Sequence, residues 1–271
     1  MNKLSVVTIN FNDKIGLEKT ITSVIHQSYA YFEYIVIDGN STDGSKELLE
    51  NYGQYITYSL SEPDSGIYNA MNKGIKVANG EYLLFLNSGD YLVDNDVLTR
   101  VGQFIDGTYD LYYGDAIFKD NINEQIVKYP NKLSFHFFTY NNLCHQATFI
   151  KKSLFETVFY YNENFKIISD WEFLIYAICI KNCTYKHIDE IICYYDFEGI
   201  SSKDNSKDLI AKETKIVMNN YFSAFIEDYK IIEEFASKRV KNLIYIKKFP
   251  LAWKILKGFS NIILLFLPKQ K

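Results

Sequence analysis

The stretches LSVVTINFND (residues 4–13), YIVIDGNSTD (34–43) and GEYLLFLNSGD (80–90) share one pattern, an apolar run that ends in a polar turn. The apolar runs are rich in β-branched and large aliphatic residues, which favours buried strands. Between the first two, apolar residues such as Ile15 and Ile21 recur at roughly helical spacing. Strands that alternate with helices indicate parallel βαβ units with helices on both faces. The sequence therefore predicts an α/β fold with a Rossmann-related, mostly parallel central sheet.

The same pattern predicts the secondary structure of most of the first half of the chain and of less of the second half. The expected strands are 3–10, 34–38, 55–60 and 80–86, and the expected helices follow Asn12 or Asp13 and cover 45–52 and 67–78. In the second half, 109–118 reads as a strand, and Ser169 to Glu172 reads as a capping box that opens an apolar helix. Residues 131–165 are rich in aromatic side chains and follow no clear period.

Charge divides the chain into two parts. The composition, 48% hydrophobic and 23% charged over 271 residues, excludes a disordered chain and a disulfide-stapled miniprotein. Nine of the 29 basic residues and none of the 33 acidic ones fall in 235–271. The preceding body is therefore strongly acidic, which argues against nucleic-acid binding and for a basic C-terminal tail that seeks an anionic surface.

The basic tail predicts where the protein acts. Residues 243–267 mix apolar side chains with lysines, and the apolar run 259–267 is too short to span a bilayer. We expect a helical extension that lies on the inner face of the cell membrane. The alternative is a helix that packs its apolar side on the body or on a second copy in a homodimer. The strand-like start and the absence of a CxxC pair predict a cytoplasmic protein with reduced thiols.

Three polar turns follow strands, and in parallel sheets ligands bind beyond the carboxyl ends of the strands. The turn after the first strand lacks GxGxxG, and the chain has no Walker A loop, so neither glycine-rich phosphate loop is present. Carboxylates that hold Mg²⁺ or Mn²⁺ are the simplest other way to meet phosphate charge. The turn Asn87–Asp90 is the expected metal site, although a turn of this kind can also merely end a strand.

Four blocks in order make a resemblance specific. TINFN, VIDGNSTDGS, SEPDSGIYNAMNKGI and GEYLLFLNSGD together resemble the donor-binding half of the family 2 glycosyltransferases, which have the GT-A fold, over about residues 3–96. CHQATF (144–149) and SDWEF (169–173) are similar to acceptor-side segments of many members. The resemblance implies a glycosyltransferase domain over 1–234, divided into a nucleotide-sugar half (1–96) and an acceptor half (97–234), followed by the basic, apolar tail (235–271).

The resemblance also implies roles for individual residues. On the donor side these are Thr8, Phe11 and Asn12 at the first strand end, Asp38 at the nucleotide base, Asp43 in the adjoining turn, Asp64 near base and ribose, and Asn69 and Asn72 on the following helix. Asn87 and Asp90 match the ends of a DxDD-like motif, and Asp90 is the carboxylate expected to touch Mn²⁺ or Mg²⁺. Asn87 and Gly89 stand where acids are frequent, so this metal affinity is expected to be low. His145 and Gln146 are expected to contact acceptor or diphosphate, unless the histidine is simply a core residue.

The implied chemistry is inverting transfer, in which an acceptor hydroxyl attacks the anomeric carbon as the nucleotide diphosphate leaves. The matching base is Asp170, with Glu172 as the alternative; both fall in the first turn of a helix, where negative charge is favoured.

We therefore predict a metal-assisted glycosyltransferase that moves a sugar from a nucleotide-diphosphate donor, UDP-linked, to a glycan or lipid-linked acceptor in cell-surface polysaccharide synthesis. A sugar nucleotidyltransferase would need a glycine-rich, basic loop after the first strand, which TINFND lacks. A non-catalytic nucleotide-sugar or glycan-binding module on the same fold is the alternative, and the acids missing near Asp90 favour it.

Overall fold

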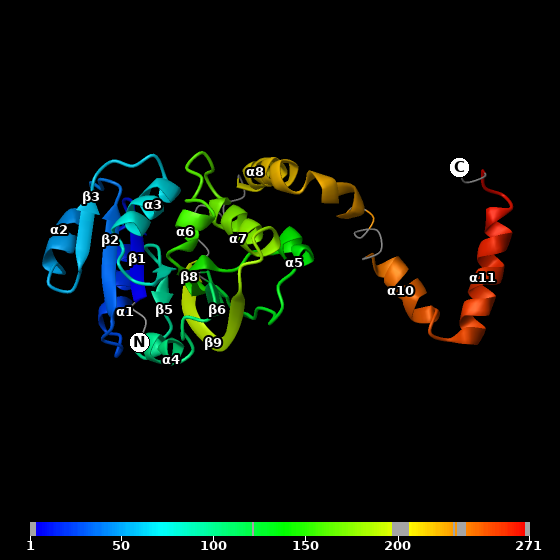
Figure 1. Ribbon diagram of the computed structural model, residues 1–271, viewed down its shortest axis with the longest axis horizontal. Coiled ribbons are helices and arrows are strands. Elements are labelled where there is room, and N and C mark those ends of the chain that lie inside the picture. Colours follow the sequence, from blue (N-terminus) through cyan, green and yellow to red (C-terminus); the bar gives the residue numbers. More distant parts are fainter. Residues whose placement is uncertain (1–3, 121, 197–205, 230, 232–236, 269–271) are drawn as a thin grey trace. The chain divides into compact units, whose positions relative to one another are not determined.

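The structure, a computed structural model, describes residues 4–120, 122–196, 206–229, 231 and 237–268 (Figure 1). Contacts divide the chain into two units, Met1–Lys215 and Ile216–Lys271. The boundary expected after residue 234 lies outside the described residues, so the division into a catalytic domain and a tail stays a prediction.

The first unit is built on one sheet with the strand order β3-β2-β1-β4-β8-β6-β9-β5, in which β7 pairs with β6. Its first four strands are parallel and match the predicted ones: β1 Leu4–Asn10, β2 Phe32–Asp38, β3 Tyr58–Ser61 and β4 Tyr82–Phe85. β1, in the middle of this group, is buried along its whole length. The prediction of a parallel half-sheet in the N-terminal part is confirmed.

The second half continues the sheet in mixed orientation. Its strands are β5 Tyr91–Leu92, β6 Leu111–Lys119, β7 Glu124–Val127, β8 Thr148–Lys151 and β9 Tyr185–Asp196. β8 runs antiparallel to both β4 and β6, whereas β6 and β9 are parallel, with an irregular register beside Asp115. The whole sheet is thus largely but not entirely parallel, as expected for this fold class.

Helices flank the sheet (Figure 1). They are α1 Lys14–Ile25, α2 Ser45–Asn51, α3 Ile67–Val77, α4 Val97–Gly102, α5 Phe135–Tyr140, the 3₁₀ turn η1 His145–Ala147, α6 Leu154–Thr157, α7 Ser169–Cys179 and α8 Ser206–Tyr221. The Asp13 side chain caps α1 by accepting a hydrogen bond from the Gly16 amide (3.0 Å). α3 packs on β1 and β2, and a Cβ on Gly74 would lie 2.5 Å from Val7 Cγ1, so this contact requires glycine.

One buried carboxylate, Glu33, holds several elements of the unit together away from the strand ends. Glu33 on β2 accepts hydrogen bonds from the Ser5 hydroxyl and from the backbone amides of Asn79 and Gly80. Burial alone would raise the pKa of Glu33, but these hydrogen bonds outweigh it and lower the pKa. The carboxylate thereby joins β1, β2 and the turn that precedes β4.

The predicted capping box is wrong, although the helix itself is present. α7 begins at Ser169, its N-cap residue is Ile168, and no side chain caps it. The Ser169 hydroxyl instead accepts a hydrogen bond from the backbone amide of Asn162. A tertiary contact has therefore taken the side chain that local spacing assigned to the cap.

The second unit is helical. It contains the end of α8, η3 Ser223–Phe225, α10 Lys238–Ile246 and α11 Pro250–Leu264. The Ser237 side chain caps α10, and Pro250 opens α11, where its missing amide hydrogen costs nothing. Within the described residues, no helix is both long enough and apolar enough to cross a membrane.

Candidate active site

Three strand-end turns meet at one edge of the sheet, as the parallel strands predict. Asn10, at the end of β1, donates from Nδ2 to Asp38 Oδ1 at the end of β2 (2.7 Å). Its Oδ1 accepts from the Ser88 hydroxyl in the turn after β4 (2.8 Å). One amide side chain thus joins all three turns.

Asp38 is held inside this network. Oδ1 accepts from Asn10 and from the Ser41 hydroxyl, and Oδ2 accepts from the Ser41 backbone amide (2.9 Å) and the Ser61 hydroxyl. Burial opposes ionisation, but these donors outweigh it and lower the pKa of Asp38. The residue is 0% exposed, so contact with a nucleotide base would require exchange of one of these hydrogen bonds.

Asn12 and Asp43 connect the turn after β1 to the turn after β2 at the protein surface. Asn12 adopts a positive φ of 50° and accepts from the Thr42 backbone amide at 2.9 Å. Asp43 accepts from the Lys14 amide at 2.8 Å and from Ser45. Both side chains therefore shape the rim of the site.

Exposed Phe11, half-buried Asp64 and buried Gly39 lie together in the expected nucleotide site. Phe11 is 65% exposed, and a Cβ on Gly39 would lie 3.0 Å from its ring and 2.6 Å from Asp64 Oδ2. Thr8 differs, because it is fully buried and shares a hydrogen bond with the Tyr34 hydroxyl (3.0 Å). An aromatic face beside a carboxylate can stack on a base and accept from ribose hydroxyls.

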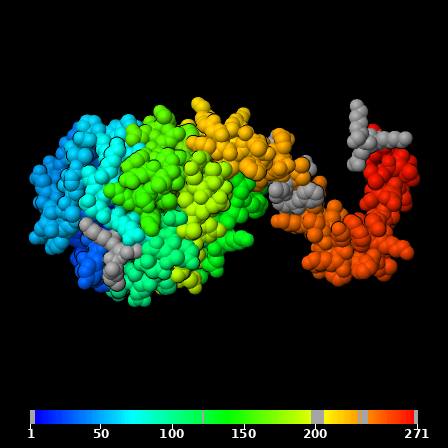
Figure 2. Space-filling view, viewed as in Figure 1, coloured from blue at the N-terminus to red at the C-terminus, as the bar shows by residue number. Residues whose placement is uncertain are grey.

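Asn69 and Asn72 on α3 face another part of the protein. Their Nδ2 atoms donate to the two carboxylate oxygens of Glu163, each at 2.8 Å. Asn72 also exchanges hydrogen bonds with the Tyr161 backbone. In Figure 2 the green atoms of the segment that contains Glu163 lie against the cyan atoms of α3. The two asparagines thereby fasten α3 to the segment that precedes α7.

Asp90 is buried behind the turn after β4. It is 3% exposed, and its oxygens accept from Gln146 Nε2 (2.8 Å) and the Asp196 amide (2.9 Å). Burial raises its pKa to about 6, although these hydrogen bonds act in the opposite direction.

Each oxygen of this carboxylate already accepts one hydrogen bond from the protein, which leaves a single lone pair on each for a metal ion. Among the described residues, no three His, Cys, Asp or Glu side chains form a group that could hold one. At Gly89 (φ +94°), a Cβ would lie 3.5 Å from an Asp196 carboxylate oxygen and 3.9 Å from Asp13 Oδ2, so an acid there would face two like charges. The metal role expected for Asp90 stays a prediction without support from this geometry.

Asp170 lies in the first turn of α7 and is 7% exposed. Oδ1 accepts from the Tyr68 hydroxyl (2.9 Å), and Oδ2 accepts from Asn142 Nδ2 (3.0 Å) and His145 Nδ1 (3.2 Å). Burial opposes ionisation, but these hydrogen bonds and the imidazole of His145 lower the pKa of Asp170. The group is therefore a carboxylate at neutral pH, as a general base must be. Glu172, two residues on, is turned away from it by the helix geometry.

His145 connects Asp170 to the turn after β4. Its Nε2 lies 3.1 Å from Asn87 Nδ2, and Asn87 Oδ1 is buried without a hydrogen-bond partner in the described structure. The next residue, Gln146, holds Asp90 and accepts at Oε1 from the Cys144 thiol (3.1 Å). Two consecutive residues of η1 thus bind Asp170, the expected base, and Asp90, the expected metal ligand.

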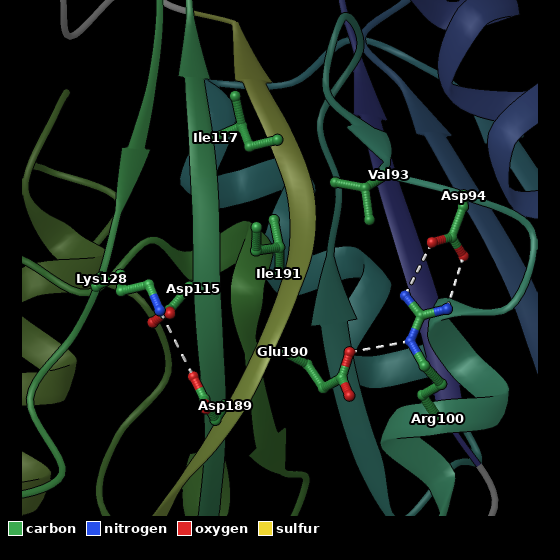
Figure 3. A pocket seen from close by; sticks show the side chains of 9 residues that line it. All are labelled: Val93, Asp94, Arg100, Asp115, Ile117, Lys128, Asp189, Glu190 and Ile191. Atoms are coloured by element: carbon green, nitrogen blue, oxygen red, sulfur yellow. Dashed lines mark hydrogen bonds and ion pairs between the residues drawn. The ribbon is translucent and has the colours of Figure 1, made fainter.

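A cavity of about 420 Å³ lies elsewhere, between the β5–α4 segment and strands β6 and β9 (Figure 3). Arg100 bonds both Asp94 and Glu190 there, so its charge is neutralised. None of the predicted site residues lines this cavity. Most of the predicted residues gather instead at the strand-end edge, whereas Asn69 and Asn72 bond Glu163.

Sequence reasoning missed several members of the site. Ser41 and Ser61 are polar residues at strand ends, so the rule that selected Asp38 would have found them. Tyr68 and Asn142 carried no such signal, because only the tertiary fold brings them to Asp170, across 102 and 28 residues respectively.

Comparison with known proteins places this geometry in a family. The model of Glycosyl transferase family 2 matches residues 5–167. The PGL/p-HBAD biosynthesis glycosyltransferase of Mycobacterium tuberculosis is 31% identical over 219 residues, which cover 77% of this chain and 82% of that protein. An uncharacterised glycosyltransferase of the same species is 34% identical over 203 residues, 73% of this chain and 77% of its own.

Solved structures show the same fold at lower identity. S. aureus TarS 1–349 in complex with UDP-GlcNAc superposes with a TM-score of 0.61 at 21% identity, over 72% of this chain and 58% of TarS 1–349. The mannosyltransferase PcManGT from Pyrobaculum calidifontis, in complex with GDP-Man and Mn²⁺, has a TM-score of 0.56 at 15% identity, over 71% and 56% of the two chains. This chain thus spans less than two thirds of either structure. The family match over most of the sheet and the curated relatives together establish that the chain belongs to the family 2 glycosyltransferases, with a GT-A-like fold.

Proposed function

We propose that this protein is an inverting glycosyltransferase that moves a sugar from a UDP-linked donor to a hydroxyl of a glycan or lipid-linked acceptor in cell-surface polysaccharide synthesis. The observation that carries the proposal is the position of Asp170. It is a buried, ionised carboxylate that His145 connects to the strand-end turn at Asn87.

The proposed step uses the two halves of the first unit differently. Phe11 and Asp64 hold the nucleoside, and the turns after β1, β2 and β4 face the donor. The acceptor hydroxyl oxygen forms a bond to the anomeric carbon, and the bond from that carbon to the diphosphate oxygen breaks with its electron pair. Asp170 takes the hydroxyl proton as that oxygen becomes acidic, a contribution typically worth about 10²–10⁴-fold in rate.

A divalent ion remains a separate proposal. PcManGT was solved with Mn²⁺ and GDP-Man, whereas an ion bound to Asp90 here would have to share the carboxylate with the hydrogen bonds from Gln146 and the Asp196 amide. Activity measured in EDTA and then in a Mn²⁺ titration tests this directly. Full activity in EDTA would contradict metal assistance.

We also propose that the second unit places the enzyme on the cytoplasmic face of the membrane. α10 and α11 contain no buried residues, and exposed apolar side chains such as Leu251, Ile255 and Phe259 share α11 with Lys254 and Lys257. Each lysine near an anionic surface contributes on the order of 1 kcal/mol. A chain that ends at Glu234 should float less with anionic liposomes than the full chain, and equal flotation would contradict this proposal.

The test of function is transfer itself. Purified protein is incubated with a panel of radiolabelled nucleotide sugars, with membranes as acceptor, and incorporation is measured. We expect incorporation from one UDP-sugar. Tight nucleotide binding without turnover of any donor would favour the non-catalytic module, for which the glycine at position 89 is the supporting feature.

A further inference from the structure

The starting observation is that His145 bonds two residues from separate parts of the sheet edge. Nδ1 lies 3.2 Å from Asp170 Oδ2, and Nε2 lies 3.1 Å from Asn87 Nδ2. A carboxylate can only accept, and an amide nitrogen can only donate. These partners therefore assign the proton to Nδ1 and leave the lone pair on Nε2.

The carboxylate of Asp170 is fixed by donors from three elements. Tyr68 comes from α3, Asn142 from the segment that follows α5, and His145 from η1. Three side-chain hydrogen bonds hold the carboxylate, one on Oδ1 and two on Oδ2, so they leave more acceptor capacity on Oδ1. The shared oxygen is thus Oδ2, and the oxygen open to a further proton is Oδ1.

Of the three residues that donate hydrogen bonds to Asp170, His145 also fixes the distance between Asp170 and the turn after β4. Its ring spans from Asp170 to Asn87, and its neighbour Gln146 is bonded to Asp90 in the same turn after β4. Displacing a reacting group by about 1 Å can cost 10²-fold in rate. A rigid ring between base and strand end is well suited to prevent such a displacement.

We propose that His145 is a positioning residue: it orients the Asp170 carboxylate and the Asn87 amide together through Nδ1 and Nε2, and it does not itself take the acceptor proton. The catalytic part of this inference rests on the proposed function. The structural part, that His145 holds Asp170, is independent of it.

Three substitutions separate the two ring nitrogens. The amide nitrogen of asparagine, a donor, can occupy the place of Nδ1, and the amide oxygen of glutamine, an acceptor, can occupy the place of Nε2. His145→Asn should keep the bond to Asp170, His145→Gln should keep only the contact with Asn87, and His145→Ala should lose both. Circular dichroism and calorimetric binding of UDP to the full chain check that each variant folds.

The first readout is the ionisation of Asp170, followed by ¹³C NMR of labelled carboxyl groups. The titratable groups that face Asp170 are His145, Tyr68 and Tyr161. Because the hydrogen bond from His145 lowers the pKa of Asp170, that pKa should rise in His145→Ala and His145→Gln and stay near the wild-type value in His145→Asn. An unchanged pKa in His145→Ala would overturn the proposal, whether or not the protein transfers sugar.

The second readout is turnover. His145→Ala should lower kcat about 10–100-fold with donor KM changed less than about threefold, and the acid limb of the kcat profile should move to higher pH. His145→Asn should recover most of kcat. A loss in His145→Ala as large as that in Asp170→Asn, without recovery in His145→Asn, would make the histidine the base and overturn the proposal. If wild-type protein transfers no sugar, the proposed function fails, and the NMR result still decides whether His145 holds Asp170.

Discussion

Replacing Asp38 by asparagine tests whether the strand-end turns are held together by one buried carboxylate. The four hydrogen bonds to Asp38 come from Asn10, Ser61 and two donors of Ser41. An amide can satisfy only part of this set, because its nitrogen must face a donor in either orientation. In the place of Oδ2 this nitrogen faces the Ser41 backbone amide, and in the place of Oδ1 it faces Asn10 Nδ2.

The expected cost follows from that count. A buried donor without an acceptor costs about 1–3 kcal/mol, and loss of the negative charge weakens the remaining hydrogen bonds by about 1 kcal/mol. The free energy of unfolding should therefore fall by about 2–4 kcal/mol at pH 7. For a unit of this size the melting temperature should drop by roughly 4–16 °C.

The assay is urea unfolding followed by fluorescence of the buried Trp171, in a Trp253→Phe background so that the second unit is silent. The matched control is Asp189→Asn, whose side chain is 88% exposed and lies 3.8 Å from Lys128. It should change stability by less than about 0.5 kcal/mol. If Asp38→Asn loses no more than this control, the carboxylate does not hold the turns, and our reading of the network is wrong.

Two further substitutions test other parts of the account. The Glu33 carboxylate stabilises the fold above its unfolded pKa of about 4.3, and this contribution is lost as pH falls through its lowered folded pKa. The melting temperature of the wild type should thus fall more steeply below about pH 4 than that of Glu33→Gln. The exposed control Glu50→Gln keeps the Glu33 carboxylate and should fall as steeply as the wild type. If Glu33→Gln falls as steeply as this control, the prediction is wrong. Gly39→Ala should weaken UDP binding about tenfold in calorimetry, because overpacking against Asp64 costs on the order of 1–3 kcal/mol. A Cβ on Gly258 would meet open space, so the control Gly258→Ala should leave UDP binding unchanged. If Gly39→Ala and Gly258→Ala bind UDP with equal affinity, the nucleotide does not bind beside Gly39 and Asp64.

The parallel half of the sheet was predictable because its signals are local. Each of β1, β2 and β4 is an apolar run that ends in a polar turn, and parallel strands place such turns at one edge. The convergence of Asn10, Asp38 and Ser88 follows from that rule alone. The aromatic region 131–165 carried no such period, and it folded into α5, η1, β8 and α6.

The partners of individual side chains were harder to predict than their positions. Asn69 and Asn72 fall where the motif places them, yet they bond Glu163, 94 and 91 residues away. Asp90 likewise lies at the end of its motif, but Gln146 and Asp196 from distant segments occupy its oxygens. Spacing along a chain fixes which element a residue joins, and only the packed structure decides what its side chain meets.

The most direct test of the central claim is sugar transfer by Asp170→Asn at saturating donor. We expect turnover to fall by about 10²–10⁴-fold, because the amide cannot take the acceptor proton, while UDP affinity stays within about threefold of the wild type. Glu172→Gln, measured beside it, should keep UDP affinity and a larger share of turnover. Turnover by Asp170→Asn that remains within about threefold of the wild type would contradict the assignment of Asp170 as the base.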